Sequence, residues 1–274
     1  MSLSALFNQF MFFSFAGWIY ETIYTTTTSK HWQNRGFLFG PICPIYGIGV
    51  VVTNLIFHQL LPYLTGHSVN TPWKVFLICA IGSAILEYSV SWLLETFFHA
   101  MWWDYSNVPL NIKGRICLPA TCGFGVAGVL FVRVIFPFMD ANVPTLPALA
   151  SQLIALLLAM LLGADIGVTV ASLSTLIARL TAMQESFDTR MASNVERIQN
   201  APDEFKERLA SLSFVQKHQL VSISKFRNVK YTSVAVSLKE AVLAFKDKAI
   251  DAAETLAEKA SATLSKEEDD KHES

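Results

Sequence analysis

Long apolar stretches separated by short polar connections make up the first two-thirds of the chain. A bilayer core of about 30 Å is crossed by about 20 mostly apolar residues in a helix. The last stretch exceeds that length and has room to tilt or to project into water. The pattern predicts an all-α, polytopic integral membrane protein with about five transmembrane helices. The predicted spans run over residues 5–24, 44–64, 73–98, 119–138 and 147–178.

The connection between the first two spans is apolar but interrupted by Gly36, Gly40 and Pro41. Backbone of this kind is tolerated at membrane depth only where protein or a water-filled cavity satisfies its polar groups. We therefore interpret residues 35–44 as a candidate re-entrant loop.

Beyond residue 178 the pattern changes to that of an amphipathic helical tail, in which apolar residues recur at steps of three and four. No acidic residue occurs between Arg208 and Lys239, so basic and apolar residues share this region. This pattern fits either a helix on an anionic lipid surface or one face of a coiled coil or helical bundle. The final residues, 265–274, are dense in charge, and we expect them to be disordered.

The two halves of the transmembrane region resemble each other. The string Trp18–Thr22 matches the string Trp92–Thr96 in its tryptophan, glutamate and threonine, and glycines and prolines in the following loops also align. Because both units enter from the same side, they indicate a parallel repeat with a pseudo-two-fold axis along the membrane normal. Chance similarity between apolar stretches is the alternative. The expected organisation is a transmembrane domain at 1–178 with repeat units 5–64 and 73–138 and a fifth helix at 147–178, a tail at 179–264 and a charged end at 265–274.

Charged residues are unevenly distributed, since residues 1–177 hold only 6 of the 21 Lys and Arg and 6 of the 22 Asp and Glu. Such sparse charge excludes a soluble single domain, and a net charge of −1 argues against nucleic acid as a partner. Lys and Arg occur in the connections 25–43 and 99–118 and in the tail, whereas 65–72 and 139–146 hold none. The positive-inside rule then predicts an N-terminus outside the inner (plasma) membrane and a cytoplasmic tail.

Carboxylates inside the predicted spans are the main functional signal. Glu87 and Asp165 each cost about 2.5–3.5 kcal/mol in hydrocarbon on insertion scales, and such residues normally face a bundle interior or a water cavity. One interpretation is a set of ion pairs that clamp the connecting loops. Another is a polar chamber in which protonation of a carboxylate couples to transport. The candidate substrate-binding, ion-binding or gating residues are Glu21, Arg35, Glu87, Glu95, Asp104, Lys113, Arg115 and Asp165.

The sequence contains no P-loop, no HExxH and no GxSxG, and its four cysteines form no CxxC pair. We therefore expect no enzymatic activity, no catalytic residues, no cofactor and no metal. A haem or metal site built from His99, Cys117 or Cys122 is a minor alternative. Because the P-loop is missing, any ATP-driven activity requires a separate ATPase.

Several strings in order are similar to those of the putative ABC-transporter type IV permease family, a group of small, mostly bacterial integral membrane proteins. The resemblance covers about residues 5–180 and implies permease activity, and Asp165 matches an acidic position in the family's last span. The matching strings are residues 15–21, 34–47, 103–106 and 111–118.

The leading hypothesis is a transporter or permease that moves a small solute or ion through a carboxylate-lined site between the repeats. An ion channel, or a membrane scaffold or sensor that acts through its tail, is the alternative. We expect the partners to be the lipid bilayer, the solute or ion, further copies in a homo-oligomer, and an ATPase subunit that docks on the 99–118 loop.

Overall fold

The computed structural model describes residues 2–29, 34, 36–144, 146–193, 211–226, 235–236, 238–240 and 242–243. Helices dominate these residues, as the apolar pattern predicts, and four of them are long and apolar enough to cross a membrane. The four candidate spans are Pro44–Thr65, Pro72–Phe98, Leu118–Asn142 and Ala148–Met183. They coincide with the second to fifth predicted stretches.

The first predicted stretch also forms a helix, α1 (Leu3–Ser29), but α1 is not among the four candidate spans. Polar residues interrupt its apolar sequence, and they bond to other helices. The Asn8 side chain donates to the Ser151 carbonyl at 3.0 Å, and Asn54 donates to Gln9 Oε1 at 2.9 Å. α1 therefore packs in the same bundle, and its crossing of the membrane stays a prediction.

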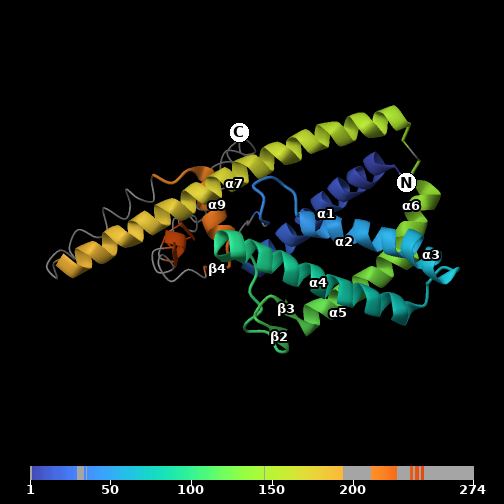
Figure 1. The fold of residues 1–274 in the computed structure, drawn as a ribbon, viewed down its shortest axis with the longest axis horizontal. Coiled ribbons are helices and arrows are strands. Elements are labelled where there is room, and N and C mark those ends of the chain that lie inside the picture. The colour runs from blue at the N-terminus through green and yellow to red at the C-terminus, as the bar shows by residue number, and fades with distance from the viewer. Residues whose placement is uncertain are drawn as a thin grey trace, which may run out of the picture.

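Two helical hairpins follow one another along the chain (Figure 1). In the first, α1 packs against a second helix so closely that a Cβ on Gly47 would lie 2.2 Å from Ser14 Oγ. In the second, a Cβ on Gly128 would lie 2.3 Å from Cys79 Sγ. Glycines allow such close backbone approach between membrane helices. The second helix of the first hairpin comprises α2 (Pro44–Leu55), η1 (Ile56–Leu60) and α3 (Leu61–Thr65), and the second hairpin comprises α4 (Pro72–Phe98), α5 (Leu118–Leu130), η2 (Phe131–Ile135) and α6 (Phe136–Asn142).

Each hairpin has a π-helical segment, η1 or η2, directly before a proline-containing turn. Pro62 and Pro137 lack an N–H and would collide with a carbonyl in an α-helical register, so a wider turn relieves the conflict. The two halves thus share the same element order. The pseudo-two-fold axis itself stays a prediction.

α7 (Ala148–Ser193) is one continuous helix that runs along the top of the bundle and past it (Figure 1). The distance from Ala148 to Thr169 is about 32 Å at 1.5 Å per residue, which matches a bilayer core. The remaining turns therefore extend beyond the span, as the length of the fifth stretch predicts. The expected domain boundary at residue 178 falls inside this helix, and the domain division stays a prediction.

The end of the bundle where α1 and α4 finish is called the loop end here, because segment 36–43 and residues 99–117 lie there. Short antiparallel strands, not expected in an all-α protein, order this region. They are β1 (Ala100–Met101), paired with β4 (Lys225–Phe226), and β2 (Asn111–Ile112), paired with β3 (Ile116–Cys117).

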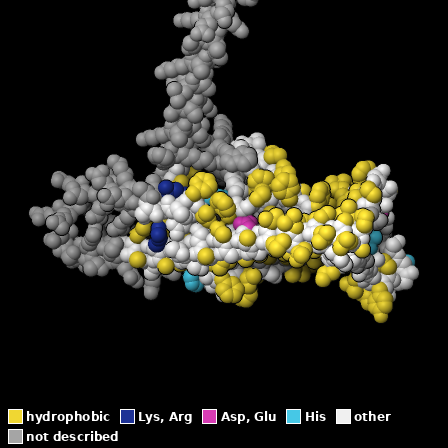
Figure 2. All heavy atoms as spheres, turned by 90° about the horizontal axis from the view of Figure 1, so that it is seen from above, with side chains coloured by type: hydrophobic (Ala, Val, Ile, Leu, Met, Phe, Trp, Pro, Cys, Tyr) yellow, Lys and Arg dark blue, Asp and Glu magenta, His cyan; other side chains and the backbone are white. Residues whose placement is uncertain are grey.

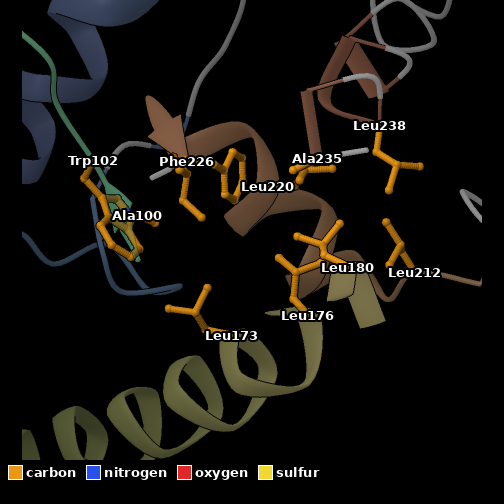
Figure 3. Packing of buried hydrophobic residues seen from close by; sticks show 11 residues of the cluster. Ala100, Trp102, Leu173, Leu176, Leu180, Leu212, Leu220, Phe226, Ala235 and Leu238 are labelled. Atoms are coloured by element: carbon orange, nitrogen blue, oxygen red, sulfur yellow. The ribbon is translucent and has the colours of Figure 1, made fainter. Parts of the chain in front are cut away.

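Part of the predicted tail packs against the loop end through α9 (Phe214–Ser222) and β4. Ser213 begins α9 with a reciprocal capping box to Gln216. Apolar side chains from α7, residues 100–102 and the tail bury one another in a single cluster (Figure 3). The apolar face of this segment thus packs on the protein's own loop end. Residues 244–274, which include the charged end 265–274 that we expect to be disordered, lie outside the described residues.

Apolar side chains cover most of the face shown in Figure 2, and the visible basic side chains gather toward one end. This distribution is typical of a bundle that contacts lipid along its length and water at its ends.

Candidate functional site

Two carboxylates and two tyrosines form a polar group between the hairpins, called the carboxylate–tyrosine cluster here. The Tyr46 hydroxyl donates to Glu21 Oε1 at 2.6 Å. The Tyr105 hydroxyl donates to Glu87 Oε1 at 3.4 Å. Each pair joins a helix that carries the acid to a separate element that supplies the phenol.

Tyr46 lies where the two hairpins meet. A Cβ on Gly17 would lie 2.4 Å from Tyr46 Cγ, so α1 has a glycine at the point where this ring packs. The Tyr46 ring centroid is 6.2 Å from that of Tyr20 on α1 and 6.3 Å from that of Phe124 on α5. Packing on both sides fixes the hydroxyl at Glu21.

Glu87 is buried, with 6% of its surface exposed, and no donor among the described residues reaches its Oε2. Two neighbouring hydroxyls are also buried without a partner in the described residues. Ser91 follows Glu87 by one helical turn, and Thr22 follows Glu21 directly. Buried polar atoms normally have partners, so these oxygens are available to a ligand.

Tyr105 connects the acids of the two hairpins. Burial raises the pKa of its phenol, and the charges of Glu87, Cys117 and Glu21 raise the pKa further. Tyr105 is therefore a neutral hydrogen-bond donor at physiological pH. The charge of Glu21 therefore reaches the Tyr105–Glu87 pair, while the hydrogen bond of this hydroxyl is to Glu87.

The Glu95–Arg115 pair lies beside this cluster. Arg115 Nη2 is 2.8 Å from Glu95 Oε2, and only 8% of the arginine is exposed. Its guanidinium also lies 5.0 Å from the Tyr88 ring centroid, within range of a cation–π interaction. The pair is one contact of the kind that the ion-pair interpretation proposes for the loops, and the sequence did not specify which acid pairs with which base.

The loop that carries Tyr105 is ordered by a tight hairpin. Lys113 and Gly114 have positive φ angles of 53° and 71° in the three-residue loop between β2 and β3, and the Arg115 N–H donates to the Ile112 carbonyl at 3.0 Å. The Tyr105 N–H donates to the Gly114 carbonyl at 2.8 Å. A Cβ on residue 114 would lie 2.3 Å from Asp104 Oδ1, so only glycine fits there.

Asp104 connects this loop to the tail. Its Oδ2 is 3.1 Å from Lys225 Nζ, and its Oδ1 accepts from the Ser106 N–H at 3.0 Å. Burial raises the pKa of Asp104, but the hydrogen bonds from Ser106 and the charge of Lys225 outweigh burial and leave the pKa below its ordinary value. Asp104 is thus an ionised contact for Lys225.

Asp165 has a different role from the cluster. The Gly40 N–H donates to both carboxylate oxygens, at 3.0 and 3.1 Å, and Thr169 Oγ1 accepts from the Phe39 N–H at 3.0 Å. The Cys43 N–H donates to the Ser14 carbonyl at 3.0 Å. Side chains of α7 and backbone of α1 therefore accept hydrogen bonds from three N–H groups of segment 36–43, and the re-entrant course of this segment stays a prediction.

The predicted residues thus separate into groups. Glu21 shares the cluster with Glu87, Glu95 pairs with Arg115, and Asp104 pairs with the tail. Asp165 holds segment 36–43, and Lys113 lies in the hairpin turn. Arg35 lies outside the described residues.

Sequence reasoning missed three participants, Tyr46, Tyr105 and Lys225. Both tyrosines occur in the strings that carry the family resemblance, which was the available signal. Within the described ranges, no three His, Cys, Asp or Glu side chains gather as a metal-ligand set. The structure therefore does not bring His99, Cys117 and Cys122 together.

Comparison with known proteins supplies the family. No curated protein and no solved structure matches the chain. Residues 8–170, more than half of the chain, match the family described as Putative ABC-transporter type IV. The match covers both hairpins, the carboxylate–tyrosine cluster and the α7 residues that hold segment 36–43. The chain therefore belongs to the putative ABC-transporter type IV family.

Proposed function

We propose that the protein is a permease that moves a small solute or ion through the carboxylate–tyrosine cluster between its two hairpins. The observation that carries this proposal is Glu87, a buried carboxylate with one oxygen that no described donor reaches. A carboxylate inside a membrane bundle is costly and commonly marks a substrate or ion pathway. A purely structural acid would have its oxygens paired, as those of Asp165 are.

The chemistry of the cluster favours a cation, a proton or a solute with a positively charged group. Glu21 and Glu87 supply negative charge, and the hydroxyls of Tyr46 and Tyr105 donate to them. Two carboxylates in a dry site repel each other unless a positive charge or a bound proton neutralises one of them. Loading and release of that charge is the step that transport requires.

The proposal includes a separate ATPase, because the sequence has no P-loop. The ATPase subunit docks on residues 99–117, because a movement of this loop would shift Tyr105, which donates to Glu87. In this proposal the protein lies in the inner (plasma) membrane with the loop end and the tail on the cytoplasmic side and the N-terminus outside, as the distribution of Lys and Arg predicts. Further copies of the chain associate along the exposed apolar face of α7, which includes Leu153, Leu157 and Leu161.

The test is flux in reconstituted vesicles. Purified protein is placed in liposomes with an internal pH-sensitive dye, and proton, Na⁺ and K⁺ gradients are imposed in turn, with protein-free liposomes as the baseline. We expect flux above that baseline in wild type and loss of that flux in Glu87→Gln, which removes the charge at nearly constant shape. Asp140→Asn is the matched control, because Asp140 is an exposed acid in the 139–146 connection.

Equal flux in Glu87→Gln and wild type would remove Glu87 from the pathway. A wild-type protein that carries no gradient-driven flux, with or without a co-purified ATPase and ATP, would contradict the permease proposal and favour a scaffold or sensor.

A further inference from the structure

One segment of the tail, residues 211–226, contacts α7, segment 36–43 and residues 100–104 at the loop end. Leu220 and Ile223 are fully buried in the cluster that also contains Leu173 and Leu176 of α7 (Figure 3). Gln219 Nε2 donates to the Thr169 carbonyl at 2.8 Å. The segment therefore lies against α7 at the turn where this helix also holds segment 36–43.

The same segment holds the start of the second loop. β4 pairs with β1, so Lys225 lies opposite Met101 directly after α4 ends. Ser224 contributes two hydrogen bonds, from its N–H to the Met101 carbonyl and from its hydroxyl to the Trp102 carbonyl, both at 2.8 Å. The backbone that leads to the cluster is thereby fixed to the tail.

A short chain of contacts connects the tail to the cluster. Lys225 pairs with Asp104, and the next residue, Tyr105, donates to Glu87. A shift of β4 therefore moves Lys225 and its partner Asp104. Asp104 directly precedes Tyr105, which belongs to the carboxylate–tyrosine cluster. Segment 36–43 is also contacted, since the Phe39 ring centroid is 5.5 Å from that of His218.

The attachment of this segment rests mainly on apolar burial. One nine-residue helix and one two-residue strand supply it, together with an ion pair whose Lys225 side chain is 42% exposed. The exposed ion pair contributes little, whereas Leu220 and Ile223 are fully buried. A charge placed in the apolar cluster should therefore detach the segment, and a change at the ion pair alone should not.

From these contacts the geometry points to residues 211–226 as a displaceable latch that holds residues 99–117 closed over the carboxylate–tyrosine cluster. When the segment detaches, Asp104 loses Lys225 and β1 loses β4, and the Tyr105 loop separates from Glu87. A cytoplasmic partner that binds the same loop competes with the latch. The inference takes the cluster as the site but does not depend on transport, because its readout is the accessibility of a thiol.

Cys117 is the natural reporter of this opening. It ends β3, only 3% of it is exposed, and its thiol acts electrostatically on Tyr105. A variant that keeps Cys117, with Cys43, Cys79 and Cys122 replaced by Ala, is treated with a membrane-impermeant maleimide in membranes open on both sides. Leu220→Asp releases the latch, because a charge in this apolar cluster is strongly unfavourable. Val236→Asp is the matched control, since Val236 is an exposed apolar residue of the same tail.

We expect Leu220→Asp to raise the rate of Cys117 labelling at least about tenfold, because a buried charge favours the released state strongly, and Val236→Asp to leave the rate unchanged. A second readout follows the latch itself. In a chain without the native cysteines, Met101→Cys and Lys225→Cys are direct strand partners, so mild oxidation should join them. Adding Leu220→Asp should abolish that disulfide.

Loss of the disulfide without faster Cys117 labelling would overturn the inference, because the tail would then detach without opening the loop. A disulfide that persists in Leu220→Asp, or that never forms, would overturn it as well. Failure of the permease proposal alone would leave these labelling results unchanged.

Discussion

At the scale of single residues, the buried charges differ in how completely they are compensated. Asp165 has its carboxylate oxygens bonded to backbone, and Glu95 has an arginine, whereas one Glu87 oxygen has no donor among the described residues. Compensated charges hold structure, and an uncompensated buried charge is retained only where something else uses it. This contrast assigns positioning roles to Asp165 and Glu95 and a binding role to Glu87.

The two ion pairs should differ in their contribution to stability. Arg115→Gln is expected to lower the free energy of unfolding by about 2–3 kcal/mol, because it leaves Glu95 partly buried without its partner. Lys225→Gln should cost about 1 kcal/mol or less, because water screens its more exposed pair. Thermal unfolding in mild detergent measures both variants, and equal losses would contradict the assigned burial.

The Asp104 contact should fail only in acid. Its pKa is below the ordinary value in the folded protein, so it contributes stability above its unfolded pKa of about 3.9, and this contribution is lost as pH falls through the folded value. The difference in melting temperature between wild type and Asp104→Asn should be constant from pH 6 to 8 and should shrink below about pH 4. A difference that varies across neutral pH would show that another group controls the contact.

At the scale of elements, helix packing depends on particular glycines. A Cβ on Gly47 would lie 2.2 Å from Ser14 Oγ and 2.3 Å from the Phe10 carbonyl oxygen, whereas a Cβ on Gly82 would meet no atom within 4 Å. Gly47 is therefore required for packing in the first hairpin, whereas Gly82 of α4 is not required.

Gly47→Ala should destabilise the first hairpin by about 1–3 kcal/mol, because backbone in α1 cannot move aside cheaply. Gly82→Ala, the matched control, should be neutral or stabilising by up to about 1 kcal/mol. The melting temperatures of the two purified variants measure this difference. A Gly47→Ala variant as stable as wild type would mean that α1 and α2 lie further apart than described.

Segment 36–43 should depend on its anchor in α7. Asp165→Ala removes the acceptor of the Gly40 N–H, so the segment should loosen and the buried Cys43 should react faster with a maleimide. Cys79 on α4 serves as the internal control in the same sample and should react as before. Unchanged reactivity at Cys43 would show that the Asp165 contact is not needed to hold the segment.

Sequence patterns predicted the elements better than their contacts. Long apolar stretches identified four spans because a helix in lipid must be apolar over its whole length. The π-helical turns before Pro62 and Pro137 were not predicted, since proline reports a conflict but not its solution. Glu95 and Arg115 were both named from sequence, whereas the Tyr46 partner of Glu21 depends on how the hairpins pack. The amphipathic tail showed an apolar face, but periodicity does not identify what covers it.

For the whole molecule, the number of membrane crossings and the orientation of one chain end together determine on which side of the membrane each site lies. Four helices meet the length and apolarity of a span, and α1 packs among them through Asn8 and Gln9. If α1 also crosses, the two chain ends lie on opposite sides of the membrane. With the N-terminus outside, as the positive-inside rule predicts, the loop end, the latch and the proposed docking surface would face the cytoplasm.

Epitope tags at the two chain ends test this count. We expect the N-terminal tag to be accessible from outside intact cells and the C-terminal tag to become accessible only after the membrane is opened. Both tags on the same side would mean that α1 does not cross, and the proposed orientation of the cluster would have to be revised.

Under the permease proposal, the transported solute or ion binds at the Glu87 carboxylate. The most direct measurement is modification of Glu87 by an apolar carbodiimide, located by mass spectrometry, in the presence of each cation that supports flux. We expect the carbodiimide to modify Glu87 and such a cation to slow this reaction in proportion to its occupancy, whereas Asp165 shows no such protection. Modification of Glu87 at the same rate with and without every cation that supports flux would contradict the permease proposal.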